Sequence, residues 1–89
     1  MAQLYKVDGT IETVQPKNGT DFSLEELQSY VGGGLIEVVP IFRTRLIVVN
    51  EEGRLKNFKH NKLASQFVGD QVNGDIVGDM VVIKRSEFK

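Results

Sequence analysis

The sequence predicts an α+β domain: a largely antiparallel sheet of about five strands that carries two short helices. Three observations lead to this fold class. Asp8-Gly9 separates two segments rich in β-forming residues, the stretch at 22–33 spells a helix with both ends marked, and turn residues at 50–53 follow an apolar strand. The expected order is β-β-α-β-β-(β)-α-β, in a single domain over residues 1–89. Because hairpins connect most strands, we expect both helices on one face of the sheet.

The N-terminal part of the chain predicts a β-hairpin. Residues 2–7 and 10–14 are the two strands, and the second is rich in Thr, Ile and Val. Asp8-Gly9 between them tolerates the positive φ angles that a two-residue type I′ turn requires.

The first helix is predicted by its capping residues. Ser23 and Glu26 have the spacing of a capping box, in which each side chain accepts a hydrogen bond from the other residue's backbone amide. Phe22 and Leu27 are placed for a hydrophobic staple. Gly32 stands where a helix C-terminus favours a left-handed residue.

The middle of the chain predicts two or three strands. Residues 35–39 have few polar positions, which indicates burial on both faces or a central place in the sheet. Pro40 lacks an amide hydrogen and marks a strand end, a bulge or an edge. Residues 45–49 form the next strand, and 54–58 pair back as a short strand after the turn at Gly53.

The C-terminal third predicts a second helix and a last strand. Asn61 caps a helix over residues 62–67, where Leu63 and Phe67 share one face. Residues 76–83 are the last strand, and Gly78 within it indicates a bulge or a close backbone approach.

Composition narrows the class of protein. The chain has 89 residues, a formal net charge of −1 and no cysteine, so it forms no disulfide and no thiolate metal site. It begins without a signal-peptide pattern and has no apolar run of about 18 residues. We therefore expect a protein of the cytoplasm, with no membrane partner, no cofactor and no metal.

Few residues point to catalysis. His60 is the only histidine, and no nucleophile or carboxylate has a spacing that pairs with it, so an exposed loop histidine is favoured. An enzyme of hydrolase type built on Glu37, Glu51 and His60 is the weakest alternative. Glu37 is a charge inside an apolar strand, so we expect it to be paired with Arg43 or Arg45, exposed at an edge, or placed at an interface.

A nucleic-acid-binding protein is the second functional hypothesis. The basic residues of the 43–62 segment would contact phosphates, and Phe42 and Phe58 would stack on bases. These basic residues are Arg43, Arg45, Lys56, Lys59 and Lys62. The slightly negative net charge argues against this hypothesis.

The order of these segments resembles one protein family. The resemblance is carried by the Leu-rich capped helix, Val31-Gly32-Gly33, Ile36-Glu37, Asn50-Glu51-Glu52-Gly53, Asn61 and Asp75-Ile76-Val77-Gly78. In this pattern the chain is similar to the family called domain of unknown function 3846, short proteins of phages, plasmids and bacteria. The resemblance covers most of the chain and implies a small accessory protein with no established reaction.

The resemblance also selects the candidate site. Its polar residues at strand ends or beside apolar strands are Glu37, Asn50, Asn61 and Asp75. They either bind a ligand or partner, or tie turns together through side-chain-to-backbone hydrogen bonds. The preferred hypothesis is a non-enzymatic binding module of phage or mobile-element origin. We expect it to engage a host protein or a small ligand in the host cytoplasm and to work as a homo-oligomer.

Overall fold

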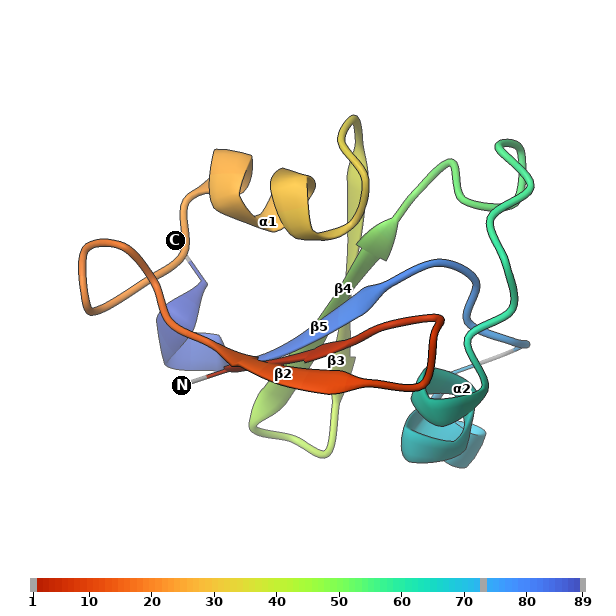
Figure 1. Ribbon diagram of the computed structural model, residues 1–89. Coiled ribbons are helices and arrows are strands. Elements are labelled where there is room, and N and C mark those ends of the chain that lie inside the picture. The colour runs from red at the N-terminus through yellow and green to blue at the C-terminus, as the bar shows by residue number, and fades with distance from the viewer. Residues whose placement is uncertain (1, 73, 89) are drawn as a thin grey trace.

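The computed structural model describes residues 2–72 and 74–88 of the chain. This part contains one five-stranded antiparallel sheet and two α-helices, which confirms the predicted α+β class (Figure 1). The strand order across the sheet is β2-β1-β5-β4-β3. Along the chain the elements are β1 (Ala2–Tyr5), β2 (Ile11–Val14), α1 (Leu24–Tyr30), β3 (Ile36–Ile41), β4 (Arg45–Asn50), α2 (Lys62–Val68), the 3₁₀ turn η1 (Gly69–Gln71), β5 (Met80–Lys84) and the 3₁₀ turn η2 (Arg85–Glu87).

Two hairpins frame the sheet, and the C-terminal strand joins them. β1 pairs with β2, and Gly9 in the connecting loop has the positive φ of +92° that the sequence predicts for this position. The predicted two-residue type I′ turn is wrong, because Asp8 does not have the positive φ that this turn requires. The loop spans residues 6–10 instead, and within it the Gly9 amide donates to Lys6 O at 3.0 Å. β3 pairs with β4 from Ile36 opposite Asn50 to Ile41 opposite Arg45. β5 lies between β1 and β4 and pairs antiparallel with both, so the last strand of the chain is the centre of the sheet.

β3 is an edge strand, so the expected central place for residues 35–39 is wrong. Val38 and Val39 are only half-buried, and β4 is the one strand that pairs with β3 within residues 2–72 and 74–88. Pro40 stands in this edge strand, where a missing amide hydrogen costs no ladder hydrogen bond. Glu37 is exposed in this edge strand, which is one of the three alternatives that the sequence leaves open for its charge.

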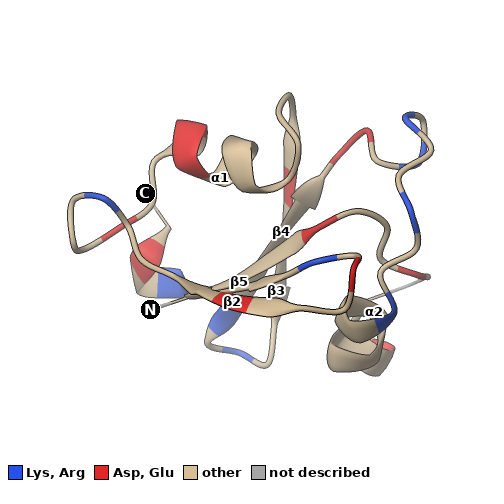
Figure 2. Cartoon of the chain, viewed as in Figure 1, with Lys and Arg blue, Asp and Glu red and all other residues tan. Residues whose placement is uncertain are grey.

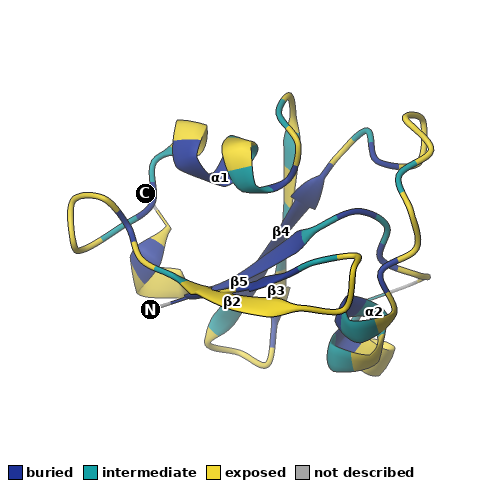
Figure 3. Ribbon diagram, in the orientation of Figure 1, coloured by how far each residue is buried: buried dark blue, intermediate teal, exposed yellow. Residues whose placement is uncertain are grey.

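The two helices lie on opposite faces of the sheet, so the prediction that they share one face is wrong (Figure 1). α1 covers a core that contains Phe22, Leu27, Val31, Leu46, Val48, Val81 and Ile83. α2 covers a core that contains Ile41, Ile47, Val49, Ala64, Val68, Met80 and Val82. β4 and β5 contribute alternate residues to both cores, which is why these strands are buried almost throughout (Figure 3).

The ends of α1 form as predicted. Ser23 Oγ accepts a hydrogen bond from the Glu26 amide at 3.1 Å, and Glu26 Oε1 accepts one from the Ser23 amide at 3.0 Å. This confirms the capping box. After the helix, Gly32 adopts a φ of +96° and the amide of Gly33 donates to Gln28 O at 2.7 Å. The glycines therefore end the helix and turn the chain toward β3.

α2 also begins where its capping residue predicts. Asn61 Oδ1 accepts a hydrogen bond from the Ala64 amide at 3.0 Å. Leu63 and Phe67 pack against the α2-side core, which confirms that they share the apolar face.

The predicted strand over residues 54–58 does not form: residues 54–57 are consecutive turns, and Phe58 follows them outside any strand. Asn57 has a positive φ of +56°, and the Phe58 amide donates back to Gly53 O at 2.9 Å. The Phe58 ring then rests against glycine backbone, within 3.5 Å of the Cβ positions that Gly32 and Gly53 lack. The half-buried ring thus packs against glycine backbone where the prediction placed a short strand.

The last strand begins at Met80, four residues later than predicted. Gly78 explains the delay, because its φ of +77° bends the chain and because a Cβ at this position would lie 2.7 Å from the Phe58 ring. This close approach is one of the two alternatives expected for Gly78. No helix within residues 2–72 and 74–88 is long and apolar enough to cross a membrane.

Candidate functional site

A cavity of about 260 Å³ opens beside β3, on the face of the sheet that carries α2. β3 and β4 form one wall, because Glu37 lies opposite Val49 in the register and Val39 lies opposite Ile47. Val72 and residues 75–77, which come before β5, form the other wall. The apolar lining is Val39, Ile47, Val49, Val72, Ile76 and Val77.

The rim of this cavity is charged. Glu37, Glu51 and Asp75 line it with exposed carboxylates, and Arg54 contributes a single exposed guanidinium. The Arg54 Nη2 donates to Asp75 O at 2.8 Å and so links the turns after β4 to the loop before β5. The site therefore combines an apolar floor with a rim that carries an excess of negative charge.

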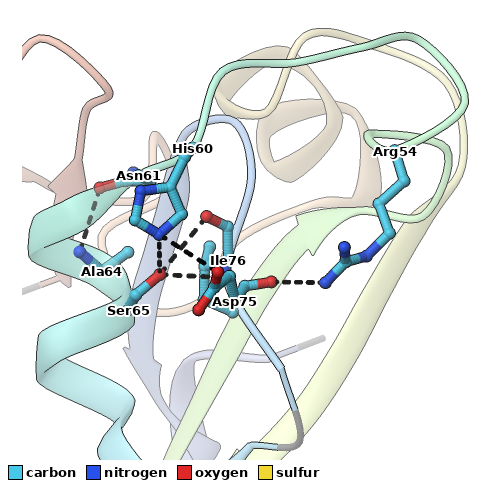
Figure 4. A network of polar contacts seen from close by, with 7 residues as sticks. All are labelled: Arg54, His60, Asn61, Ala64, Ser65, Asp75 and Ile76. Carbon is cyan, nitrogen blue, oxygen red and sulfur yellow. Dashed lines mark hydrogen bonds and ion pairs between the residues drawn. The ribbon is translucent and has the colours of Figure 1, made fainter.

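The loop at Asp75 is held against α2 by a small polar network (Figure 4). The Ile76 amide donates to Ser65 Oγ at 2.9 Å, and the Asn61 amide donates to Ile76 O at 2.8 Å. His60 Nε2 lies 3.6 Å from Asp75 Oδ2. These contacts fix the backbone on one side of the cavity and leave the Asp75 side chain exposed.

Asn50 lines the cavity but directs its amide group at backbone. Its Nδ2 donates to Val31 O at 3.0 Å and to Gly33 O at 2.8 Å, while its Oδ1 accepts from the Glu52 amide at 2.8 Å. The side chain is buried. Asn50 therefore ties the end of α1 to the turn after β4.

Asn61 lies outside the cavity and is completely buried. Besides capping α2, its Nδ2 donates to Tyr5 O and to Gly78 O, both at 2.9 Å. One amide group thus joins β1, α2 and the approach to β5. Of the four predicted site residues, the structure brings Glu37, Asn50 and Asp75 to one cavity and gives Asn50 and Asn61 the geometry of braces.

Ser65, His60 and Asp75 lie together, although the sequence spacing does not indicate it. Ser65 Oγ is 3.3 Å from His60 Nε2, and the Asp75 carboxylate approaches the same nitrogen. A serine–histidine–aspartate relay needs the hydroxyl and the carboxylate on different ring nitrogens. Because Nε2 takes both contacts, the arrangement braces the loop and lacks the relay geometry. The hypothetical set Glu37, Glu51 and His60 is also divided, since His60 does not line the cavity.

The five basic residues of the nucleic-acid hypothesis fall into two groups (Figure 2). Arg43 and Arg45 lie at the β3–β4 hairpin, where β4 begins. Lys56, Lys59 and Lys62 follow the other end of β4, a strand length of about 20 Å away. They therefore do not form the continuous surface that the segment 43–62 predicts.

Three further features of the site concern metal ions, the ion pair expected for Glu37, and lining residues that the sequence did not indicate. Within the described residues, no group of three or more His, Cys, Asp or Glu side chains is arranged to hold a metal ion. Glu37 forms no ion pair there with Arg43 or Arg45, since the hairpin carries both arginines away from it. Sequence reasoning missed Arg54, Val72 and Val77 as lining residues, because only the tertiary fold brings their loops to β3.

These features define the class of protein: a small antiparallel α+β domain with helices on both faces and an amphipathic cavity at one sheet edge. The family model described as "Domain of unknown function (DUF3846)" matches residues 4–88. The chain belongs to this family, as the order of its motifs predicts. Comparison with curated proteins and with solved structures gave no significant match.

Proposed function

We propose that this protein is a non-enzymatic binding module and that the cavity at β3 holds its ligand. The observation that supports the proposal is the combination of a concave apolar floor with charged groups at its mouth. The half-buried Val39 and Val77 would contact an apolar stem, while Glu37, Glu51 and Asp75 would face a positively charged end. The chemistry that fits is an ammonium or guanidinium group on a short alkyl chain.

Such a group has two natural sources. It is either a free amine or the Lys or Arg side chain of a host protein that docks along β3. An exposed edge strand supports the second source, because its outer backbone groups are open to a partner segment. The family resemblance supports a phage or mobile-element protein that acts in the host cytoplasm, with a homo-oligomer as a further part of the proposal.

Titration by NMR spectroscopy tests the cavity. We expect n-butylammonium and n-butylguanidinium to shift the amide signals of Val39, Val49 and Ile76 in a saturable way. Neutral n-butanol should bind more weakly, because it lacks the charge. Glu37→Gln should weaken the cation's binding about fivefold, the equivalent of about 1 kcal/mol for a partly exposed charge pair.

Glu25→Gln is the matched control for this titration. It removes the same charge from an exposed position on α1, which packs on the opposite face of the sheet. Its binding curve should match that of the unmodified protein. Equal binding of butanol and the two cations, or equal weakening by Glu25→Gln, would remove the cavity from the proposal.

The partner and the oligomeric state require separate measurements. Light scattering after size-exclusion chromatography gives the mass in solution. A host protein retained by the unmodified chain but not by Glu37→Gln with Asp75→Asn would identify the protein source. A monomer that retains neither host protein nor amine contradicts the proposal.

A further inference from the structure

Two positive charges face each other where β4 meets β5. Arg45 lies directly opposite Lys84 in the strand register. Their neighbours Leu46 and Ile83 point into the α1-side core, so Arg45 and Lys84 both project on the α2 side. Like charges at directly opposed positions destabilise a strand pair. The fold therefore carries a local repulsion that packing does not explain.

The β3–β4 hairpin brings a third cation to this pair. Arg43 stands in the hairpin loop with a φ of +62°, and the preceding Phe42 has a φ of +47°. Positive φ angles at two consecutive residues other than glycine are strained, and strain of this kind gathers at functional sites. The loop thus holds the Arg43 backbone in a costly conformation next to Arg45.

A fourth cation is fixed in place beside them. Arg85 Nε donates to Arg43 O at 2.8 Å, and the Arg85 amide donates to Thr44 O at 3.2 Å. These bonds position the guanidinium while it remains exposed. The resulting basic cluster surrounds a depression of about 280 Å³, which is lined by Arg43, Thr44, Arg45, Lys84, Arg85 and Ser86.

Four cations gather in the basic cluster, and the carboxylate of Glu87 attracts one of them, Lys84. Among the described residues no carboxylate forms an ion pair with any of the four cations. Glu87, the acidic residue nearest to them in the chain, is buried and accepts a hydrogen bond from the Lys84 backbone amide at 2.9 Å. Gln3 and Thr13 beside the cluster are exposed and uncharged.

We propose that the basic cluster binds a phosphoryl group. Planar guanidinium groups match the oxygens of phosphate in paired hydrogen bonds, and Lys84 adds a point charge. A bound phosphate would also remove the repulsion between Arg45 and Lys84. The group comes either from a free phosphate compound or from a nucleic-acid backbone. This site lies at the start of β4, away from the cavity at its end, so the two proposals stand or fall separately.

The first test is an NMR titration of the full chain with pyrophosphate and, separately, with a single-stranded oligothymidine. Saturable shifts at the amides of Thr44, Arg45 and Arg85 are expected in at least one titration, above a sodium chloride control of equal ionic strength. Shifts with both probes, or with the oligonucleotide alone, identify a nucleic-acid backbone as a source. Shifts with pyrophosphate alone identify a free phosphate compound. No saturable shift with either probe overturns the proposal.

Charge-neutral variants locate the site. Arg45→Gln with Lys84→Gln should weaken binding at least tenfold, whereas Lys56→Gln with Lys59→Gln removes the same charge elsewhere and should leave it unchanged. Arg43→Asn is a milder variant, since asparagine tolerates positive φ, and it should weaken binding severalfold. Equal loss in the Lys56 and Lys59 control would show general charge attraction and overturn the assignment.

Thermal unfolding gives an independent readout. In low-salt buffer without phosphate, Arg45→Gln with Lys84→Gln should raise the melting temperature, because the opposed charges are gone. Pyrophosphate should raise the melting temperature of the unmodified protein and leave that of this variant unchanged. A lower melting temperature for the variant than for the unmodified protein contradicts the repulsion between Arg45 and Lys84. An equal rise in melting temperature of the two proteins with pyrophosphate contradicts binding at this pair.

Discussion

At the scale of single residues, Asn61 joins more parts of the fold than any other polar side chain described above. Replacing it with alanine removes the cap of α2 and takes the buried Nδ2 donor away from the carbonyl groups of Tyr5 and Gly78. A lost cap costs about 1 kcal/mol and each unsatisfied buried group about 1–3 kcal/mol. We expect Asn61→Ala to lower the free energy of unfolding by about 3 kcal/mol or more in urea denaturation.

The control for this variant lies on the same helix. Gln66 is exposed on α2, so Gln66→Ala tests the effect of alanine in the helix without the loss of a buried amide. It should change the free energy of unfolding by less than about 0.5 kcal/mol. Comparable losses in the two variants would show that the buried hydrogen bonds of Asn61 contribute little.

Gly78 tests the close approach of Phe58 to backbone. Alanine here meets two obstacles, a φ of +77° and a ring atom 2.7 Å from the new Cβ. Gly9 shares the positive φ but has no heavy atom within 4 Å of the same position. We expect Gly9→Ala to cost about 1 kcal/mol and Gly78→Ala at least twice that, measured by urea denaturation. If Phe58→Leu fails to recover part of the Gly78→Ala loss, the ring contact is not its cause.

At the scale of secondary-structure elements, local signals explain what the sequence could predict. Ser23, Glu26 and Asn61 act on amides three residues away or fewer, so their helix starts can be read without tertiary information. The strand expected at 54–58 does not form, because a contact between residues far apart in the sequence determines the conformation there. Its conformation depends on Phe58 meeting Gly78, which lies far along the chain.

The capping box of α1 predicts a pH dependence. Glu26 accepts hydrogen bonds from the amides of Ser23 and Lys17, at 3.0 and 2.9 Å, and these bonds lower the pKa of its carboxyl group below the ordinary value. A pKa that is lower in the folded state stabilises the protein above the ordinary glutamate value of about 4.3, and this contribution is lost as the pH falls through the folded-state pKa.

The Glu26→Gln variant should therefore have a lower melting temperature than the unmodified protein at pH 7. This difference in melting temperature should shrink progressively below about pH 4.5. Thermal unfolding followed by circular dichroism from pH 7 to pH 3 measures this difference. Glu25→Gln removes a charge from the same helical turn without touching the two hydrogen bonds. A difference for Glu26→Gln that stays constant down to pH 3 contradicts the role of the ionised carboxylate.

At the scale of the whole molecule, the sequence does not predict which strands lie at the centre of the sheet or on which face each helix packs. The uninterrupted apolar runs at Leu46–Val49 and Met80–Ile83 are typical of strands covered on both faces. The sequence analysis predicts a central place for the similar run at 35–39, but β3 lies at the edge of the sheet. Strand order is a property of tertiary pairing, and so is the cavity, whose walls come from β3, β4 and the loop before β5.

Because β4 and β5 belong to both cores, the two faces of the sheet should unfold together. Each face carries its own reporter: Tyr5 lies in the α2-side core, and Tyr30 packs against the α1-side core. We expect the NMR signals of both tyrosines to disappear at the same urea concentration, in one cooperative transition.

Matched substitutions sharpen this test. Ile47 and Ile83 are both fully buried, on the α2 side and the α1 side respectively. Ile47→Val and Ile83→Val should each lower the common midpoint, at a cost of about 1 kcal/mol, and should shift both tyrosines equally. Ile11→Val on the exposed edge strand β2 should leave the midpoint unchanged. If Ile47→Val moves the transition of Tyr5 alone, the two cores are separate folding units, since a shared sheet would transmit the loss to Tyr30.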